Sequence, residues 1–308
     1  MPNPLLIGAA RSPLARRLIS GSKTTRRVVD RFVAGERPED ALAATQRLVS
    51  EGLTVTIDHL GEDTRSAEQA RQVTDAYLSL LRDLGARGLA SDAEVSLKLS
   101  ALGQALPGDG ERVALSAARE ICTAAAAAGT TVTVDMEDHT TVDSTLTVVR
   151  DLRADFPWVG AVLQSCLRRT EQDCRDLATP GSRVRLVKGA YAEPASVAHR
   201  SRSEVDAAYV RCLSTLMSGP GYPMVATHDP ALITTADELA LAGGRVTTSY
   251  EFQMLYGIRV PEQHRLAASG RQMRVYVAYG EDWYGYFMRR LAERPANVTF
   301  FLRSFVSS

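Results

Sequence analysis

Two arginines share one face of a short apolar segment that ends at a glycine. Residues 183–191 read Arg-Val-Arg-Leu-Val-Lys-Gly-Ala-Tyr. Because side chains alternate faces along a strand, Arg183 and Arg185 point the same way. The run breaks at Gly189, where backbone can approach a ligand closely. The pattern indicates a site for an anionic or polar group, although for a single arginine an interior salt bridge is the simpler interpretation.

Polar side chains also recur on one parity of neighbouring segments. In Glu94–Ser100 and Thr131–Met136, polar residues alternate with Val, Leu or Met. The apolar parity must pack against helices, so in a closed sheet the polar parity faces the lumen. Burying such groups is costly unless they pair or bind something. The predicted inward set is Lys98, Asp135, Gln164 and Arg185, and Tyr276 lies near the end of the last predicted strand.

Each of these residues also has a purely structural interpretation. Lys98 and Asp135 could form an interior ion pair, and Gln164 could bond a neighbouring carbonyl. His228 could be an ordinary loop histidine. Their coincidence near the carboxyl ends of several strands, where barrel enzymes place their chemistry, favours a functional site.

Two adjacent arginines, Arg289 and Arg290, lie near the start of the last predicted helix. Positive charge at that end opposes the helix dipole, so the pair is unfavourable for the helix itself. The cost suggests forked recognition of a carboxylate or phosphate. A solvated pair on the outer face is the alternative.

Strand-like and helix-like segments alternate from residue 52 onward. The predicted strands are Leu53–His59, Glu94–Ser100, Thr131–Met136, Gly160–Ser165, Arg183–Lys188, Met224–His228, Arg245–Ser249 and Gln272–Val277. Eight such units in about 250 residues have the number and size of a (β/α)8 barrel. No GxGxxG or GxxxxGK[ST] occurs, which disfavours an open nucleotide-binding sheet. We therefore predict an α/β fold, with a distorted TIM-type barrel over residues 52–308 and an N-terminal helical arm over residues 1–51.

Capping residues predict where several helices begin. Three segments have capping-box spacing: Thr140-x-x-Asp143, Thr170-x-x-Asp173 and Ser201-x-x-Glu204. Asp229-Pro230 offers an N-cap followed by proline at the first helical position. Each should open a helix that follows a strand.

Composition argues against several classes of protein. Lys+Arg and Asp+Glu each number 36 and aromatics are 6%, so no basic or stacking surface points to nucleic acid. The four cysteines form no CxxC pair, which fits free thiols in a reducing compartment. The five histidines show no HxH or HExxH spacing, so no metal site is signalled. No apolar run is long enough to suggest a membrane-spanning helix.

The N-terminal 29 residues carry six basic side chains and no acidic one. A transit peptide, a helix on an anionic membrane surface and an ordinary surface helix would each fit, and we favour the last. The next stretch, Pro38–Glu51, is a predicted helix, which disfavours a cleaved peptide.

The sequence resembles the proline dehydrogenase family in its short, single-function bacterial form. The matching stretches are Asp58–Glu62, Ser96–Ser100, Val134–Glu137, Arg185–Tyr191, Ala226–Asp229, Glu251–Gly257 and Tyr286–Glu293. Their order and spacing over nearly the whole chain after residue 45 make the resemblance specific. Cys166, Ala192 and Ala278 depart from residues common in the family, which leaves the adenine-side contacts and the last loop open.

The resemblance implies oxidation of L-proline to Δ1-pyrroline-5-carboxylate, with hydride transfer to N5 of FAD and electrons passed to a membrane quinone. Arg289, Arg290 and Lys98 would bind the proline carboxylate. Tyr276 and Leu255 would cover the ring. A cytoplasmic location is implied, with peripheral contact at the inner face of the membrane as an option.

The resemblance also assigns the remaining roles. Asp135 would order the substrate's hydrogen bonds, Arg185 would lie at flavin N5, and Glu62 would pair with Arg289 as a gate. The residues implied to hold FAD are Met136, Gln164, Arg185, Val187, Lys188, Gly189, Ala190, Thr227 and His228.

Two other functions stay open from the residues alone. A class I aldolase-type barrel would form a Schiff base on Lys98 or Lys188, which requires a lysine of depressed pKa. A non-catalytic barrel would bind no chromophore and would tolerate changes at Arg289 or Arg290.

Overall fold

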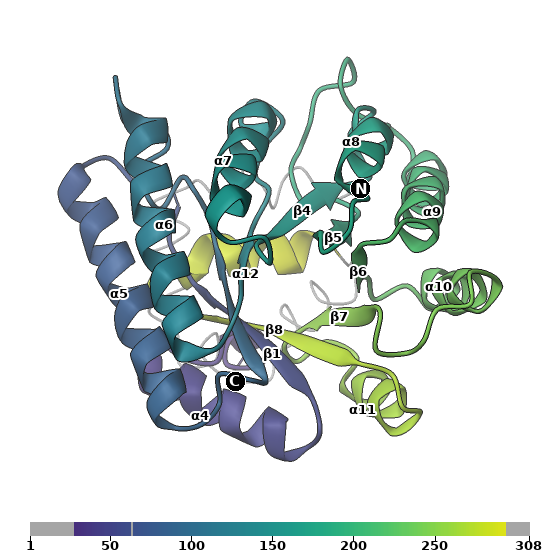
Figure 1. The fold of residues 1–308 in the computed structure, drawn as a ribbon, viewed down its shortest axis with the longest axis horizontal. Helices are drawn as coiled ribbons and strands as arrows, with labels where there is room; N and C mark the ends of the chain where they lie inside the picture. The colour runs from purple at the N-terminus through teal and green to yellow at the C-terminus, as the bar shows by residue number, and fades with distance from the viewer. Residues whose placement is uncertain (1–27, 63, 294–308) are drawn as a thin grey trace, which may run out of the picture.

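Eight parallel strands close into a barrel in chain order, with helices around it (Figure 1). The computed structural model describes residues 28–62 and 64–293. The strands are β1 (Thr54–His59), β2 (Ala93–Leu97), β3 (Val132–Val134), β4 (Gly160–Gln164), β5 (Arg183–Val187), β6 (Tyr222–Ala226), β7 (Glu251–Leu255) and β8 (Met273–Tyr279). The predicted α/β barrel is therefore confirmed.

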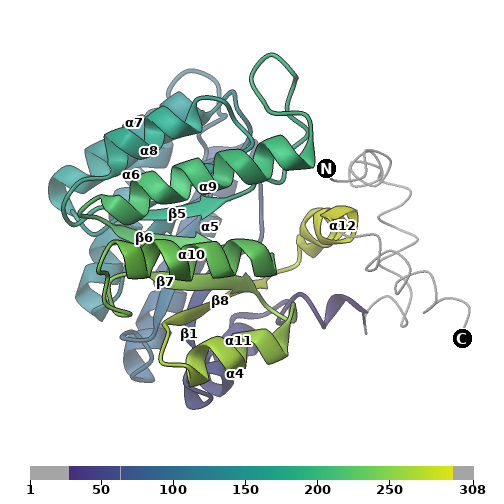
Figure 2. The same ribbon diagram turned by 90° about the vertical axis from the view of Figure 1, so that its right-hand side faces the viewer.

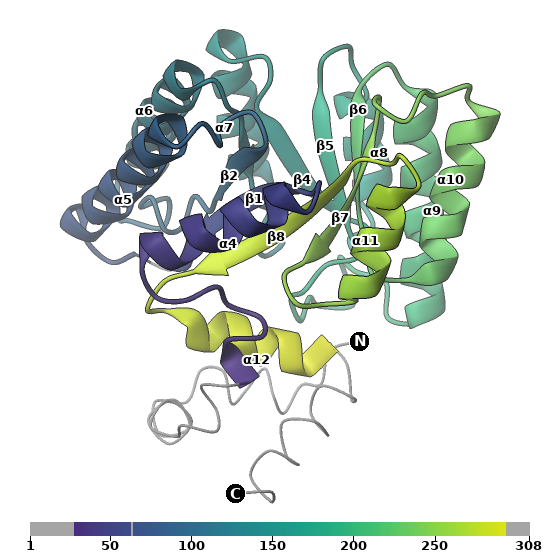
Figure 3. The same ribbon diagram turned by 90° about the horizontal axis from the view of Figure 1, so that it is seen from below.

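Most helices form the outer ring, but two have other positions. The helices are α4 (Pro38–Ser50), α5 (Ala67–Ala86), α6 (Gly110–Ala128), α7 (Val142–Asp155), α8 (Thr170–Leu177), α9 (Arg202–Ser218), α10 (Pro230–Ala242), α11 (Val260–Ala268) and α12 (Trp283–Glu293). α4 packs on β1 and β8, whereas α12 lies beyond one end of the barrel (Figure 2, Figure 3). Within the described residues, no helix combines the length and apolarity needed to span a bilayer. Residues 1–27 lie outside the described part, so the division at residue 51 stays a prediction.

The seventh strand was misplaced by the sequence interpretation. Residues 245–249, predicted as a strand, precede β7 and form a turn. Arg245 explains the difference, because its guanidinium donates to the backbone carbonyls of Leu216, at 3.1 Å, and Met217, at 2.7 Å, at the end of α9. The true strand was obscured by Glu251 and Gln253, two polar residues that are buried.

All four predicted helix starts lie within one residue of an observed start, but only two of the predicted caps form. Ser201 forms a reciprocal capping box with Glu204, and Asp229 caps α10 ahead of Pro230. The boxes at Thr140 and Thr170 are wrong, since α7 follows Thr141 and α8 follows Arg169. The hydroxyl of Thr170 instead donates to the carbonyl of Gln164, at 2.5 Å.

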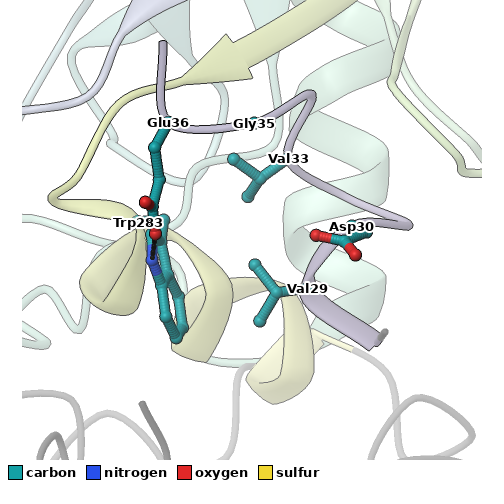
Figure 4. A pocket seen from close by; sticks show the side chains of 6 residues that line it. All are labelled: Val29, Asp30, Val33, Gly35, Glu36 and Trp283. Atoms are coloured by element: carbon teal, nitrogen blue, oxygen red, sulfur yellow. Dashed lines mark hydrogen bonds between the residues drawn. The ribbon is translucent and has the colours of Figure 1, made fainter. Parts of the chain in front are cut away.

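An apolar cluster separate from the main core joins the arm to α12. Its members are Val28, Val29, Phe32, Val33, Leu60, Ala278, Tyr284, Tyr286, Phe287 and Met288. Backbone bonds reinforce it, from Ala34 N–H to the Ala278 carbonyl at 2.9 Å and from Gly280 N–H to the Gly35 carbonyl at 3.0 Å. A small pocket lies at this joint (Figure 4), where Trp283 Nε1 donates to Glu36 at 3.2 Å. The arm therefore helps to position α12.

Candidate active site

Lys98 is held inside the barrel by a carboxylate from the neighbouring strand. Its Nζ lies 2.8 Å and 2.7 Å from the two carboxylate oxygens of Asp58, whereas Asp135 Oδ2 is 4.0 Å away. Asp58 and Ser96 are register partners on β1 and β2, so the alternation of both strands brings Asp58 and Lys98 into the lumen. Lys98 and Asp135 do share the lumen, but Asp58 is the closer partner of the ammonium.

Arg185, Asp135 and Tyr276 form a continuous polar chain across the lumen. Arg185 Nη1 donates to Asp135 Oδ1 at 2.8 Å, and the Tyr276 hydroxyl donates to Asp135 Oδ2 at 2.6 Å. The Arg185 guanidinium also lies 5.3 Å from the centre of the Tyr276 ring. Burial, then the charge of Asp135, raises the pKa of Tyr276 well above its ordinary value. The phenol is therefore neutral and acts as the donor.

Arg289 extends from α12 toward the loop that follows β1. Its guanidinium pairs with Glu62, with Nη1 3.1 Å from Oε2, and lies 6.0 Å from the centre of the Tyr191 ring. The implied Glu62–Arg289 pair is thus present, while its role as a gate stays a prediction. Arg290 has different surroundings, since its guanidinium lies 4.9 Å from the ring centre of Tyr286 on its own helix.

Several residues implied to hold the cofactor already bond the backbone. Gln164 Nε2 donates to the Glu137 carbonyl at 2.7 Å, and His228 Nε2 accepts from Leu255 N–H at 3.0 Å. The structural interpretations of Gln164 and His228 therefore both hold, and their cofactor roles stay predictions. Thr227 Oγ1 accepts from Asp229 N–H at 3.1 Å. Met136, the residue before Glu137, is buried.

Leu255 and Tyr276 are register partners on adjacent strands β7 and β8. The two side chains therefore project from the same face of the sheet at the same height along the barrel. Both could pack against one small ring. Their neighbour in the lumen is Arg185, which lies against the Tyr276 ring.

Two features of the described residues bear on whether a bound group fits. Arg185 Nε is buried and has no hydrogen-bond partner among them. Gly189 has φ +109°, and a Cβ there would collide with Sγ of Cys166. The carbonyls of Val187 and Lys188 accept from Ser165 and Cys166 N–H. The buried Arg185 Nε is a donor that a polar cofactor could use, whereas Gly189 is required by its positive φ and its close contact with Cys166.

Three residues of the site were missed from the sequence. Asp58 lies on the polar parity of β1, so the same alternation rule could have found it. Glu94 was seen as polar and inward, but its partners, Arg183 at 2.7 Å and Arg185 at 3.3 Å, come from a distant strand. Tyr191 lies in a loop, where no periodicity predicts which way a side chain points.

Neither lysine suits a Schiff base. Burial alone would lower the pKa of Lys98, but the charges of Asp58, Asp135 and Glu62 outweigh it and raise that pKa. Lys188 Nζ lies 3.0 Å from Asp229 and 2.5 Å from Asp206. Both ammonium groups are paired with carboxylates, so the aldolase alternative finds no support in the geometry.

Comparison with known proteins identifies the family to which this sequence is similar. The sequence profile described as "Proline dehydrogenase" matches residues 41–303. Proline dehydrogenase of Deinococcus radiodurans is 42% identical over 89% of this chain and 88% of its own length. The chain belongs to the proline dehydrogenase family. It is thus an enzyme that oxidises proline, and the non-catalytic alternative is wrong.

Further relatives agree with that assignment. Proline dehydrogenase 1 of Bacillus subtilis is 39% identical over 91% of both chains. The structure of PutA from Bdellovibrio bacteriovorus, inactivated by N-propargylglycine, has a TM-score of 0.80 at 26% identity over 87% of this chain. A Bradyrhizobium japonicum PutA mutant, at 24% identity and a TM-score of 0.73, shares the fold. The chain spans about a third of these PutA chains, 33% and 32%.

Proposed function

We propose that the enzyme is FAD-dependent and oxidises L-proline to Δ1-pyrroline-5-carboxylate. The observation that carries the proposal is the Arg185–Asp135–Tyr276 chain beside the Lys98–Asp58 pair, in a barrel of the proline dehydrogenase family. This cluster offers cations and oriented hydrogen bonds, but no metal-ligand group is found among the described residues. Bound FAD supplies the hydride acceptor, at flavin N5.

The proposed cofactor residues surround the carboxyl ends of β3 to β6. They are Met136, Gln164, Arg185, Val187, Lys188, Gly189, Ala190, Thr227 and His228. The buried Arg185 Nε, which has no hydrogen-bond partner among the described residues, supports this assignment. A cation at this position favours negative charge on a reduced flavin, so Arg185 is proposed to assist hydride transfer.

The remaining lumen groups are proposed to bind the substrate. Arg289 and Arg290 take the carboxylate by forked hydrogen bonds, with the Lys98 ammonium supporting that end. Tyr276 and Leu255 pack over the pyrrolidine ring, and Asp135 fixes the Tyr276 hydroxyl. The amine must be neutral when hydride leaves, and we assign its proton to solvent.

Glu62 is proposed to gate the site. Arg289 cannot give both arms of its fork to Glu62 and to a substrate carboxylate at once, so binding exchanges one carboxylate partner for another. The exchange keeps the partly buried guanidinium paired in both states, which avoids the cost of an isolated charge.

Electrons are proposed to pass to a membrane quinone, with cytoplasmic enzyme touching the inner face of the membrane.

The purified protein tests the cofactor and the substrate together. It should be yellow, and L-proline should bleach it in the absence of oxygen, whereas D-proline, which presents the opposite stereochemistry, should not. A colourless protein that stays apo after incubation with FAD would overturn the proposal.

A further inference from the structure

The carboxylate of Glu94 accepts hydrogen bonds from several side chains, which is more than an ion pair with one arginine would need. Its side chain is 1% exposed at the base of the lumen. Two arginines and three threonines donate to the carboxylate: Arg183 Nη2 at 2.7 Å, Arg185 Nη2 at 3.3 Å, Thr56 at 2.8 Å, Thr131 at 2.8 Å and Thr133 at 3.2 Å. Three threonine hydroxyls on a carboxylate fix its position as well as its charge.

Arg185 is thereby held between two carboxylates from different strands. Nη2 reaches Glu94, whereas Nη1 reaches Asp135 at 2.8 Å and the Ser96 hydroxyl at 3.0 Å. A guanidinium is planar, so two anchored arms set the direction of the third nitrogen, Nε. That third nitrogen is the buried one without a partner among the described residues.

We propose that Glu94 is a positioning residue for proline oxidation. From the base of the lumen, its carboxylate sets the orientation of the Arg185 guanidinium. The inference rests on the proposed function of Arg185 at the flavin. Without its ion pair to Glu94, the Arg185 guanidinium turns toward Asp135, the carboxylate that also accepts a hydrogen bond from the Tyr276 hydroxyl. Loss of Glu94 therefore disturbs both the cation beside the flavin and the hydrogen bonds beside the substrate.

The lumen contains a matched control for charge alone. Glu251 is also 1% exposed and pairs with Arg274, at 2.8 Å, on the adjacent strand. None of its hydrogen bonds among the described residues reaches Arg185; they come from Arg274, Tyr222 and Gln253. Glu251→Gln therefore removes the same charge from the same lumen and leaves Arg185 anchored.

The experiment compares the FAD-loaded wild type, Glu94→Gln and Glu251→Gln. Both variants lose a negative charge, so both should raise the midpoint potential of the flavin, which by itself favours reduction. We expect Glu94→Gln nevertheless to slow flavin reduction by L-proline about tenfold or more, because Arg185 is displaced. FAD affinity should stay near the wild-type value. Slower reduction at a higher potential cannot result from charge alone.

A second variant covers the case in which Glu94→Gln folds poorly. Arg183→Gln combined with Glu94→Gln removes one charge of each sign and restores neutrality. If Glu94 serves only Arg183, this double variant regains the wild-type rate and the inference is overturned, as it also is if Glu94→Gln and Glu251→Gln behave alike. A persistent loss supports it. A wild type that neither binds FAD nor responds to proline would instead overturn the proposed function.

Discussion

The ammonium of Lys98 is bound by both carboxylate oxygens of Asp58, in a pair whose side chains are 9% and 1% exposed. Asp58→Asn should lower the free energy of unfolding by about 3 kcal/mol, because a buried cation loses its main partner. Chemical denaturation measures the change. Lys98→Met added to Asp58→Asn should recover most of the loss, and strictly additive losses in the double variant would show that the pair is not coupled.

Arg289→Ala should weaken proline binding strongly. Truncating one partner of a buried, hydrogen-bonded charge pair costs about 2–5 kcal/mol, which should appear as a raised KM for proline. Arg271→Ala is the control, since Arg271 is also paired with a carboxylate, Asp237 at 2.8 Å, but lies before β8. An unchanged KM in Arg289→Ala would remove the carboxylate assignment.

Tyr276→Phe should impair substrate binding while preserving the fold. The ring still packs on Arg185, but the 2.6 Å hydrogen bond to Asp135 is lost, at a cost of about 1.5–3 kcal/mol for a bond to a charged group. Tyr222→Phe is a matched comparison, because the Tyr222 hydroxyl, in the same barrel, donates to Gln272 Oε1 at 2.6 Å and lies 3.2 Å from Glu251. Steady-state kinetics should show a raised proline KM in the first variant only. Equal effects in both would assign the loss to general loosening of the barrel.

Glu137 should give the stability of the enzyme a specific pH dependence. Burial, opposed by hydrogen bonds from Ser100, raises the pKa of Glu137 from 4.5 to about 7. Between these values the folded protein holds a proton that the unfolded chain releases, so the free energy of unfolding falls as pH rises. Glu137→Gln removes this contribution. Denaturation across pH 4.5 to 7 should show a shallower decline in the variant, and parallel profiles would contradict the shifted pKa.

The succession of eight strand–helix units was enough to predict the closed barrel, and the alternation of polar and apolar residues predicted the inward direction of Lys98, Asp135 and Arg185. It could not predict which carboxylate binds Lys98, because that choice depends on the stagger between neighbouring strands. Strand β7 was not predicted because the partners of its side chains also come from neighbouring strands. Its lumen residues Glu251 and Gln253 are polar and paired, so the segment lacks the apolar character expected of a buried strand.

Loops were the other limit. The ring of Tyr191 meets the guanidinium of Arg289 only because a loop after β5 and a helix after β8 converge on one end of the barrel. Because Tyr191 and Arg289 share no periodic sequence pattern, the sequence alone cannot predict that their side chains are in contact. The pair of adjacent arginines pointed to Arg289, and the family resemblance supplied Glu62, whose pairing with Arg289 the structure shows.

The apolar joint between residues 28–36 and α12 has a thermodynamic consequence. Because it is a cluster apart from the main core, it can open locally while the barrel stays intact, with a smaller free energy than global unfolding. A substrate that engages Arg289 on α12 binds the closed form and stabilises it by mass action. The N–H groups of Ala34 and Gly280 join the two segments by hydrogen bonds. Their amide hydrogen exchange should therefore slow when substrate binds in the lumen, although neither residue contacts it.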